Sequence, residues 1–298
     1  MKNKRSFPGF RLRIQAVIPT WFGPVFAKTL TVSLLCIAAL TLPRLAAAQG
    51  ACNKITVGYS NYPPFSYQTD DGGVTGASIE VAQRAFRKMH IEVSTVQMPW
   101  ARLLSEAERG TVDMITAAYR TDARRSWAVY ADIPIGYERV VVIHDRTVQA
   151  DVASLRDLRY RKGLLRRGDS HGPTVDRAIA NKSINIETVP EIEAGLRMVS
   201  AGRADYLLSS DAVARNVLRE RQYPELSYDR LDVNGEGLYA LFSRRSPCSR
   251  LVEEFNRTLR QLNSEHLLPT VLVQYLQSVG SPLVVNTASN GPRHNLAN

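Results

Sequence analysis

Aromatic side chains follow the first apolar alternation of the chain and could form one wall of a ligand site. The stretch SNYPPFSYQ, residues 60–68, comes directly after ITVGYS and carries Tyr62 and Phe65 around Pro63-Pro64. Proline lacks a backbone donor and does not fit inside a central strand, so we expect the strand to end near Tyr62. The rings could pack on the core as a rigid turn or face a ligand, and the stretch alone is compatible with both.

The sequence lacks the familiar signatures of metal or redox chemistry. The five histidines are scattered along the chain, and there is no CxxC or HExxH motif. We therefore expect neither a metal site nor a cofactor.

The first 48 residues have the composition of a secretory signal peptide. A basic segment without acidic residues precedes the apolar run LTVSLLCIAALTL (30–42), and RLAAAQ then offers a small-residue cleavage site. The run is shorter than the roughly 20 residues of a membrane-spanning helix. We expect export to the periplasm and cleavage near Ala48, with an uncleaved membrane anchor as the alternative.

Removal of residues 1–48 changes the charge of the protein. These residues hold seven of the 38 lysines and arginines and none of the 28 acidic residues. The remaining chain has 31 basic and 28 acidic side chains, a net charge of +3. A nucleic-acid-binding function based on net charge therefore loses most of its support.

Two cysteines, Cys52 and Cys248, remain after residue 48. An oxidising compartment would allow them to form one disulfide. Two free buried thiols are the alternative that the sequence leaves open.

Strand and helix patterns alternate from residue 53 onward. KITVGYS, EVSTVQM and VDMITAA have the apolar pattern of strands, and we expect a hairpin around 71–73. SIEVAQRAFRKMH places Ile79, Ala82 and Phe86 at helical spacing, with Ser78 as the expected N-cap. This alternation predicts an α/β fold with mostly parallel sheets.

Two segments echo each other and suggest two similar lobes. GTVDMITAA (110–118) and GRADYLLSS (202–210) each follow an amphipathic helix and begin with a glycine where a helix C-cap is expected. The segments end in the small pairs Ala117-Ala118 and Ser209-Ser210. Ligands of open α/β sheets bind beyond the carboxyl ends of strands, where small side chains expose backbone N–H groups. The alternative is that any helix–glycine–strand unit has this pattern.

The order of these pieces resembles the family 3 extracellular solute-binding proteins, the periplasmic receptors of polar amino-acid ABC transporters. The likeness covers about residues 53–277 and rests on ITVGYSNYPPFSY, VTGASIEVAQ, GTVDMITAAYRTDARRSWAVYADIPI, AGRADYLLSS and LYALFSRRSPCSRLVEEFNRTL. PWAR and the pair Tyr119-Arg120 resemble a divergent branch of the family. The resemblance implies a type II periplasmic-binding-protein fold, with two α/β lobes joined by two crossing segments and a ligand cleft between them.

The resemblance also implies boundaries for the lobes. We expect the first lobe to comprise 49–136 and 238–285 and the second to comprise 137–237. The polar, aperiodic residues 286–298 are expected to form a disordered tail.

Three positions match residues that bind ligand in the family. Tyr62 matches an aromatic that packs against the ligand side chain, with Phe65 expected beneath it. Arg124, in TDARRSW, matches the arginine that holds the ligand's α-carboxylate through a planar fork of donors. Ser170, in RGDSHG, matches a donor of the second lobe near the same carboxylate.

Other positions depart from the family pattern. Ala117 and Ala118 stand where amino-acid receptors often have serine or threonine, and Ser210 stands where the family has an aspartate for the α-ammonium group. Asp211 is adjacent and could replace that aspartate. An uncompensated ammonium in a desolvated cleft is costly, so either Asp211 or another carboxylate faces the ligand, or the ligand is not a standard α-amino acid.

Two further residues are candidates for the ligand site. Trp100, in PWAR, could contact the ligand or serve as a core or hinge residue. Arg120 follows the small pair and could be a second anion clamp.

The function that we expect is a monomeric binding protein that captures a small polar ligand with a carboxylate and delivers it to an ABC permease. The alternatives are a cyclohexadienyl dehydratase-like enzyme on the same fold, which would need a general acid in the cleft, and a sensory ligand-binding module. We expect no enzymatic activity and no nucleic-acid partner.

Overall fold

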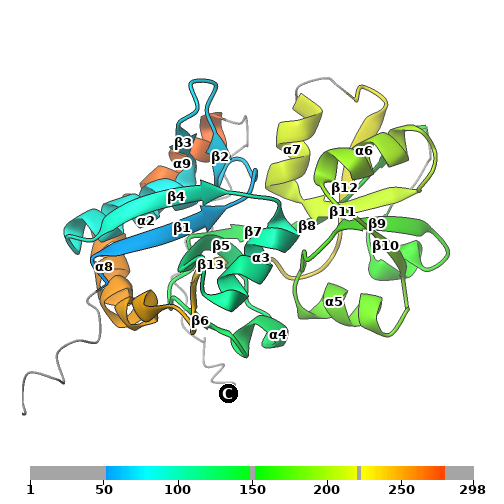
Figure 1. Cartoon of the computed structure of the whole chain (residues 1–298). Coiled ribbons are helices and arrows are strands. Elements are labelled where there is room, and N and C mark those ends of the chain that lie inside the picture. The colour runs from blue at the N-terminus through cyan, green and yellow to red at the C-terminus, as the bar shows by residue number, and fades with distance from the viewer. Residues whose placement is uncertain (1–51, 148–151, 220–222, 279–298) are drawn as a thin grey trace, which may run out of the picture. The chain divides into compact units, whose positions relative to one another are not determined.

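The computed structural model describes residues 52–147, 152–219 and 223–278. The expected signal peptide, 1–48, and the expected tail, 286–298, lie outside the described residues. The described strands and helices form two α/β lobes, each built on its own sheet (Figure 1). The α/β fold predicted from the alternating pattern is therefore confirmed. The prediction that the sheets are mostly parallel is wrong, because both sheets mix parallel and antiparallel strand pairs.

Six of the described strands form the sheet of the first lobe. They are, in spatial order, β4 (Glu92–Gln97), β1 (Lys54–Tyr59), β5 (Met114–Tyr119), β13 (Glu236–Ser243) and β6 (Ala128–Tyr130), with β7 (Gly136–Glu138) also paired to β13. β1 is parallel to β4 and β5, whereas β13 is antiparallel to β5, β6 and β7. The carboxyl ends of β1 and β5 therefore lie at the same edge of the sheet.

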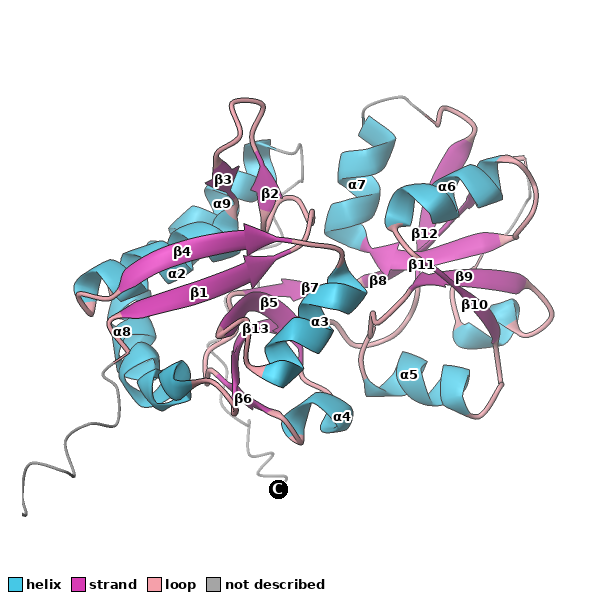
Figure 2. Ribbon diagram, in the orientation of Figure 1, coloured by secondary structure: helices cyan, strands magenta, loops and turns pink. Residues whose placement is uncertain are grey.

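Helices pack against this sheet (Figure 2). They are α2 (Ala77–Lys88), α3 (Trp100–Arg109), α4 (Asp122–Arg125), η3 (Pro247–Leu251), α8 (Val252–Ser264) and α9 (Leu267–Ser278). Phe86 of α2, Phe255 of α8 and Phe242 of β13 form a buried cluster with ring centroids 5.1–6.4 Å apart. Burial of each ring contributes about 2–3 kcal/mol. Within the described residues, no helix is both long and apolar enough to cross a bilayer.

The start of α2 differs from the prediction. The helix begins at Ala77 with Gly76 as its N-cap, so the prediction that Ser78 caps it is wrong. Ser78 is fully buried, and its hydroxyl instead donates to the carbonyl of Phe65 over 2.7 Å. The hydroxyl thus joins the helix to the turn that holds the aromatic residues. The predicted hairpin is confirmed as β2 (Tyr67–Gln68) and β3 (Val74–Thr75).

The second lobe contains a five-stranded sheet. Its elements are β10 (Asn185–Val189), β9 (Lys162–Arg166), β11 (Tyr206–Ser210), β8 (Val140–Asp145) and β12 (Leu226–Arg230) in spatial order, with η2 (Leu155–Leu158), α5 (Pro173–Ala180), α6 (Ile192–Ser200) and α7 (Asp211–Arg219) around them. Two successive residues of β8 belong to different hydrophobic clusters. Val142 packs in one cluster with Leu158 and Val175, and Ile143 packs in another with Leu196. Helices therefore cover both faces of this sheet.

The two echoing segments occupy equivalent places in their sheets. Gly110 is the left-handed C-cap of α3 with φ 86°, and Gly202 follows α6 with φ 65°. β5 follows Gly110 and pairs in parallel with β1 and antiparallel with β13. β11 follows Gly202 and pairs in parallel with β9 and antiparallel with β8. The shared pattern therefore reflects a shared topological position.

Two segments carry the chain between the lobes. β7 ends at Glu138 in the first sheet and β8 begins at Val140 in the second, and the return runs from β12 to β13. The expected lobe boundaries at 137 and 237 fall inside β7 and β13, which both belong to the first sheet. The boundaries are corrected accordingly, because the pairing of β7 with β13 extends the first sheet to the point of crossing.

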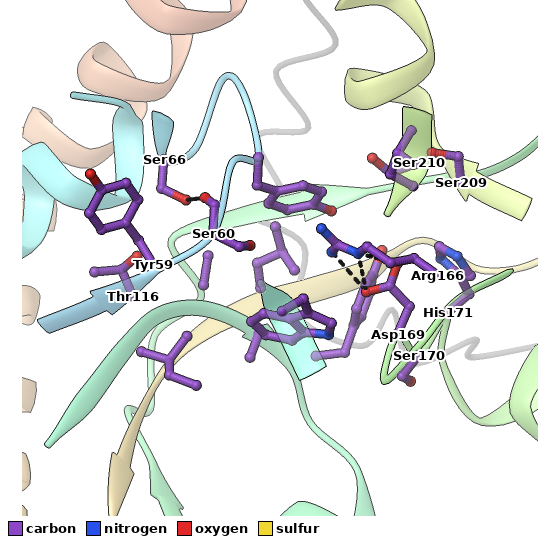
Figure 3. Close-up of a pocket in the computed structure, with 18 of the residues that line it drawn as sticks. Tyr59, Ser60, Ser66, Thr116, Arg166, Asp169, Ser170, His171, Ser209 and Ser210 are labelled. Atoms are coloured by element: carbon purple, nitrogen blue, oxygen red, sulfur yellow. Dashed lines mark hydrogen bonds and ion pairs between the residues drawn. The ribbon is translucent and has the colours of Figure 1, made fainter. Parts of the chain in front are cut away.

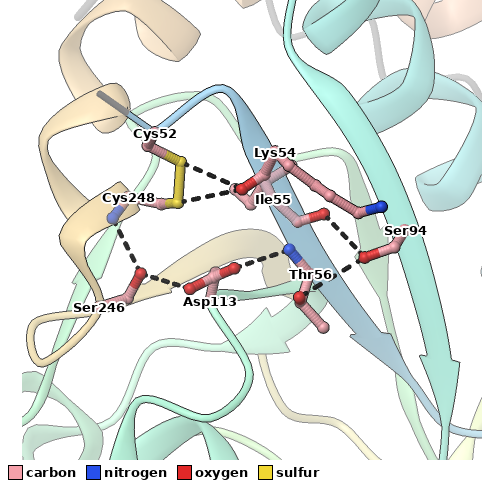
Figure 4. Close-up of a disulfide and its surroundings, with 8 residues drawn as sticks. All are labelled: Cys52, Lys54, Ile55, Thr56, Ser94, Asp113, Ser246 and Cys248. Carbon is pink, nitrogen blue, oxygen red and sulfur yellow. Dashed lines mark hydrogen bonds between the residues drawn. A yellow bond between two sulfur atoms is a disulfide. The ribbon is translucent and has the colours of Figure 1, made fainter. Parts of the chain in front are cut away.

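Cys52 and Cys248 form a disulfide with a Cα–Cα distance of 5.2 Å (Figure 4). The bond joins the residues that precede β1 to η3, across 196 positions of sequence. Next to it, Asp113 accepts hydrogen bonds from the backbone of Thr56 and from the hydroxyl of Ser246. The disulfide and Asp113 thus fasten the first strand to the returning end of the chain.

We expect the double variant Cys52→Ala/Cys248→Ala to have a free energy of unfolding about 2–5 kcal/mol lower than wild type, because the bond closes a long loop in the unfolded chain. Urea denaturation of both proteins measures the difference. Reduction of the wild-type protein should lower its free energy of unfolding by a similar amount. The same reducing treatment should leave the stability of the double variant unchanged. Equal stability of the oxidised and reduced wild type would contradict a stabilising role.

Candidate functional site

A small cavity lies between the lobes, at the carboxyl ends of β1, β5, β9 and β11 (Figure 3). Its volume is about 30 Å³. This is space for one or two water molecules, so a larger ligand requires the lobes to part or side chains to move. Its position agrees with the general rule that open α/β sheets bind ligands beyond the carboxyl ends of their strands.

Seven of the ten expected site residues line this cavity. They are Tyr62, Trp100, Ala117, Ala118, Arg124, Ser170 and Ser210. The hydroxyl of Ser170 donates to Asp176 over 2.5 Å, and Ala117 and Ala118 bring no side-chain donor. Phe65, Arg120 and Asp211 are not among the lining residues.

Phe65 supports Tyr62 from below. It is 1% exposed, and its ring stacks on that of Tyr62 with centroids 5.6 Å apart. The turn is closed by the backbone hydrogen bond from the N–H of Tyr62 to the carbonyl of Ser66. The aromatic stretch therefore serves both roles left open by the sequence: Phe65 packs in the core and Tyr62 faces the cavity.

Arg120 lies away from the cavity and supports neighbouring strands. Its guanidinium carbon is 3.6 Å from the ring centroid of Tyr239, and Nη2 donates to the carbonyl of Ala131 over 2.5 Å. These contacts occupy the side chain, so the structure does not bring it into the ligand site.

Asp211 is engaged by arginines outside the cavity. Its carboxylate accepts from Arg215 on the same helix and pairs with Arg230 over 3.1 Å. The structure therefore does not supply it as a substitute for the family's ammonium-binding aspartate.

Arg124 connects the two lobes at the cavity. The side chain is 6% exposed, with Nη1 donating to the carbonyl of Tyr119 over 2.9 Å and Nη2 to the carbonyl of Gly168 over 2.8 Å. Trp100 Nε1 donates to the same Gly168 carbonyl over 3.0 Å. Each Nη of a guanidinium carries two N–H groups, so further donors remain for a ligand oxygen.

Arg166 is a site residue that sequence reasoning missed. Arg166 ends β9, is 4% exposed, and pairs with Asp169 over 2.8 Å. Both residues line the cavity. The available signal was position, because Arg166 stands at the carboxyl end of a strand, where the ligand was expected.

His171 is a buried histidine of the cavity wall. Neither ring nitrogen of His171 has a well-aligned hydrogen-bond partner among the described residues. The backbone of Leu208 lies near the ring and raises the pKa of His171 slightly, because it interacts favourably with the protonated imidazole. Burial lowers the pKa of His171 despite the opposing effect of Asp169. The imidazole is therefore neutral at pH 7 and offers both a donor and an acceptor.

Glu138 is a buried carboxyl group beside three residues of the cavity wall. Its Oε2 accepts from the hydroxyls of Tyr62 and of Tyr119, the latter over 3.1 Å. Burial raises the pKa of Glu138 to about 7, although hydrogen bonds from Tyr62, Ser210 and Tyr119 lower it. The carboxyl group therefore changes charge near neutral pH. Its sequence context, YERVVV, resembles that of an ordinary solvent-facing glutamate.

Metal chemistry has no evident place in the described part of the chain. No group of three or more histidine, cysteine, aspartate or glutamate side chains there could hold a metal ion. The site instead offers arginine and hydroxyl donors between aromatic rings, an arrangement that suits a small oxygen-bearing ligand.

The raised pKa of Glu138 predicts that its ionisation destabilises the folded protein. The ordinary pKa of glutamate is 4.5, so the stabilisation from a protonated Glu138 is complete below about pH 4.5 and is lost as the pH rises through about 7. Glu138→Gln mimics the protonated form. We expect it to gain about 3 kcal/mol relative to wild type between about pH 5 and pH 8, measured by urea denaturation.

The exposed Glu253 of α8 provides a matched control, because Glu253→Gln changes the same group at the surface. Its stability relative to wild type should stay nearly constant over that range. A constant difference for Glu138→Gln as well would contradict the raised pKa.

Curated relatives match most of the described chain. Cyclohexadienyl dehydratase of Pseudomonas aeruginosa is 24% identical over 213 residues, which are 68% of this chain and 78% of that protein. The L-cystine-binding protein TcyJ of Escherichia coli K12 is 22% identical over 184 residues, 62% of this chain and 65% of that protein. The relatives thus include both a binding protein and an enzyme.

Solved structures share the fold. The P235GK mutant of ArgBP from T. maritima has a TM-score of 0.65 and 18% identity, and covers 76% of this chain and 96% of its own. A histidine kinase sensor domain with similarity to periplasmic binding proteins has a TM-score of 0.66 and 20% identity, covering 75% and 96%. These neighbours support the type II periplasmic-binding-protein fold.

One family model spans nearly all of the described residues. The model of the bacterial extracellular solute-binding proteins, family 3, matches residues 55–278. The match includes both lobes and every residue that lines the cavity. The chain belongs to the bacterial extracellular solute-binding proteins of family 3.

Proposed function

We propose that this protein is a periplasmic receptor that captures a small carboxylate-bearing ligand between its lobes and delivers it to an ABC permease. The observation that carries this proposal is the cavity between the lobes with the buried Arg124 in its wall. A buried guanidinium with spare N–H groups is a strong receptor for a carboxylate, because charge-assisted hydrogen bonds gain strength away from water. The family supports the transport role, and we further propose that the receptor is monomeric.

Closure of the lobes is the proposed means of capture. The Gly168 carbonyl of the second lobe accepts from Arg124 and Trp100 of the first, so these bonds form only when the lobes are together. The crossing segments are short, and the returning one, between β12 and β13, carries Gly235, at which backbone rotation meets little hindrance from a side chain. A ligand that contacts both lobes would stabilise the closed state.

Export by residues 1–48 is part of the proposal. The disulfide between Cys52 and Cys248 supports it, because such bonds persist in oxidising compartments. Amino-terminal sequencing of the mature protein tests cleavage near Ala48.

The proposal treats the protein as a receptor without enzymatic activity. The titratable groups that line the cavity beside the arginines and tyrosines are Asp169, which is paired with Arg166, and His171, whose pKa burial lowers. Neither is suited to act as a general acid at neutral pH. Turnover of prephenate or arogenate by the purified protein would overturn this part of the proposal.

We expect Arg124→Ala to weaken binding of the native ligand about a hundredfold, because the carboxylate loses its buried partner. Mass spectrometry of material that co-purifies with the protein identifies that ligand, and calorimetry measures its affinity. The exposed neighbour supplies a control: Arg125→Ala should bind as wild type does. Equal affinity of Arg124→Ala and wild type would show that the carboxylate is held elsewhere.

A further inference from the structure

The cavity wall contains a cation-binding position, called here the cation place, between Tyr62 and Trp100. The side chain of Arg166 occupies it. The guanidinium carbon of Arg166 lies 5.6 Å from the ring centroids of both Tyr62 and Trp100. Its Nε and Nη2 donate to the carboxylate of Asp169 over 2.8–3.1 Å (Figure 3). Two aromatic faces and a carboxylate are the elements that bind a free cationic group in proteins. Here these elements hold Arg166.

The charges left for a ligand are positive. Arg124 and Arg166 line the cavity with one acidic residue, Asp169, which Arg166 already engages. No hydrogen bond from Nη1 of Arg166 occurs within the described residues, so this group is available to a ligand oxygen. The site therefore has spare donors for oxygen and an excess of one positive charge.

No lining carboxylate remains for an ammonium group. Ser210 lines the cavity with a hydroxyl group, and Asp211 is paired with Arg215 and Arg230. Glu138 is not a lining residue, and its Oε2 accepts from the hydroxyls of Tyr62 and Tyr119. An ammonium group enclosed here would lose its hydration without gaining a counter-ion, at a large cost.

An outer pocket of about 400 Å³ adjoins the cavity, and the two share Ser60, Arg166 and Ile192. Glu191 and Glu193 line only the outer pocket. Arg166 thus stands at the boundary between an acidic outer pocket and a basic inner cavity.

We infer that Arg166 is a specificity-determining residue: it occupies the cation place between Tyr62 and Trp100 and thereby selects a small organic acid that lacks an α-ammonium group. The carboxylate of this ligand binds Arg124, and a second oxygen-bearing group of the ligand binds Nη1 of Arg166. The inference rests on the proposed function for the role of Arg124. It departs from amino-acid recognition in the chemistry of the ligand.

Matched pairs of ligands test the selection in the wild-type protein. Succinate and L-aspartate differ by the ammonium group, and 2-oxoglutarate and L-glutamate differ by its replacement with a keto oxygen. Calorimetry should show that each acid binds at least about tenfold more tightly than its amino-acid counterpart. Tighter binding of either amino acid would overturn the inference.

Arg166→Ala tests the cation place directly. The variant leaves Asp169 and the two rings without their guanidinium, so L-arginine and methylguanidinium should bind it about tenfold or more tightly than they bind wild type. Arg167→Ala, at the exposed neighbouring position, should show no such gain. A folded Arg166→Ala protein, verified by circular dichroism, that gains no affinity for either cation would refute the inference.

A second variant covers the case in which Arg166→Ala does not fold. Arg166→Gln keeps an N–H donor for Asp169 but removes the charge, and it should narrow the preference for succinate over L-aspartate. An unchanged preference would count against Arg166. Wild type could bind none of the four test compounds (succinate, L-aspartate, 2-oxoglutarate and L-glutamate). In that case a gain of cation binding in Arg166→Ala supports the inference, and no gain refutes it. These results are separate from those of Arg124→Ala, which tests the receptor function itself.

Discussion

The carbonyl of Gly168 accepts two hydrogen bonds from the opposite lobe, and the closed cleft depends on this contact. Arg124 donates over 2.8 Å and Trp100 over 3.0 Å. Gly168 has φ +85°, a conformation that other residues adopt only with strain, so the turn after β9 can present this carbonyl because the residue is glycine. The same turn leads from Arg166 to Asp169 and His171 and so sets the second-lobe wall of the cavity.

Buried charge is the main energetic constraint on this wall. Arg124, Arg166 and Glu138 are each at most 6% exposed, and burial of an unpaired charge is costly. Arg166 is compensated by Asp169, and Arg124 by backbone carbonyls that a ligand carboxylate can supplement. Glu138 avoids the cost by a pKa of about 7, which favours its neutral form at slightly acidic pH. This distribution of charge supports the carboxylate-bearing ligand that we propose.

The parts of the site that could be predicted from the sequence lie at the ends of recognisable elements. Tyr62 stands in the proline-containing turn after β1, Ala117 and Ala118 lie near the end of β5, and Arg124 follows a short loop. Arg120 and Asp211 are equally close to strand ends, yet they contact Tyr239 and Arg215 instead of the cavity. Proximity in sequence places a residue near the site but does not set the direction of its side chain.

The sequence by itself determined the α/β pattern, the equivalent glycine–strand units and the proline-containing turn that follows β1. These features follow from local rules: the period of apolar side chains, the conformational freedom of glycine and the missing donor of proline. Only the tertiary structure decided the disulfide, the Arg166–Asp169 pair within the cavity and the burial of Glu138. Cys52 and Cys248 are 196 positions apart, and Tyr62 and Glu138 are 76 apart. Burial and pairing of such residues arise only when distant segments meet and exclude water, which no local pattern encodes.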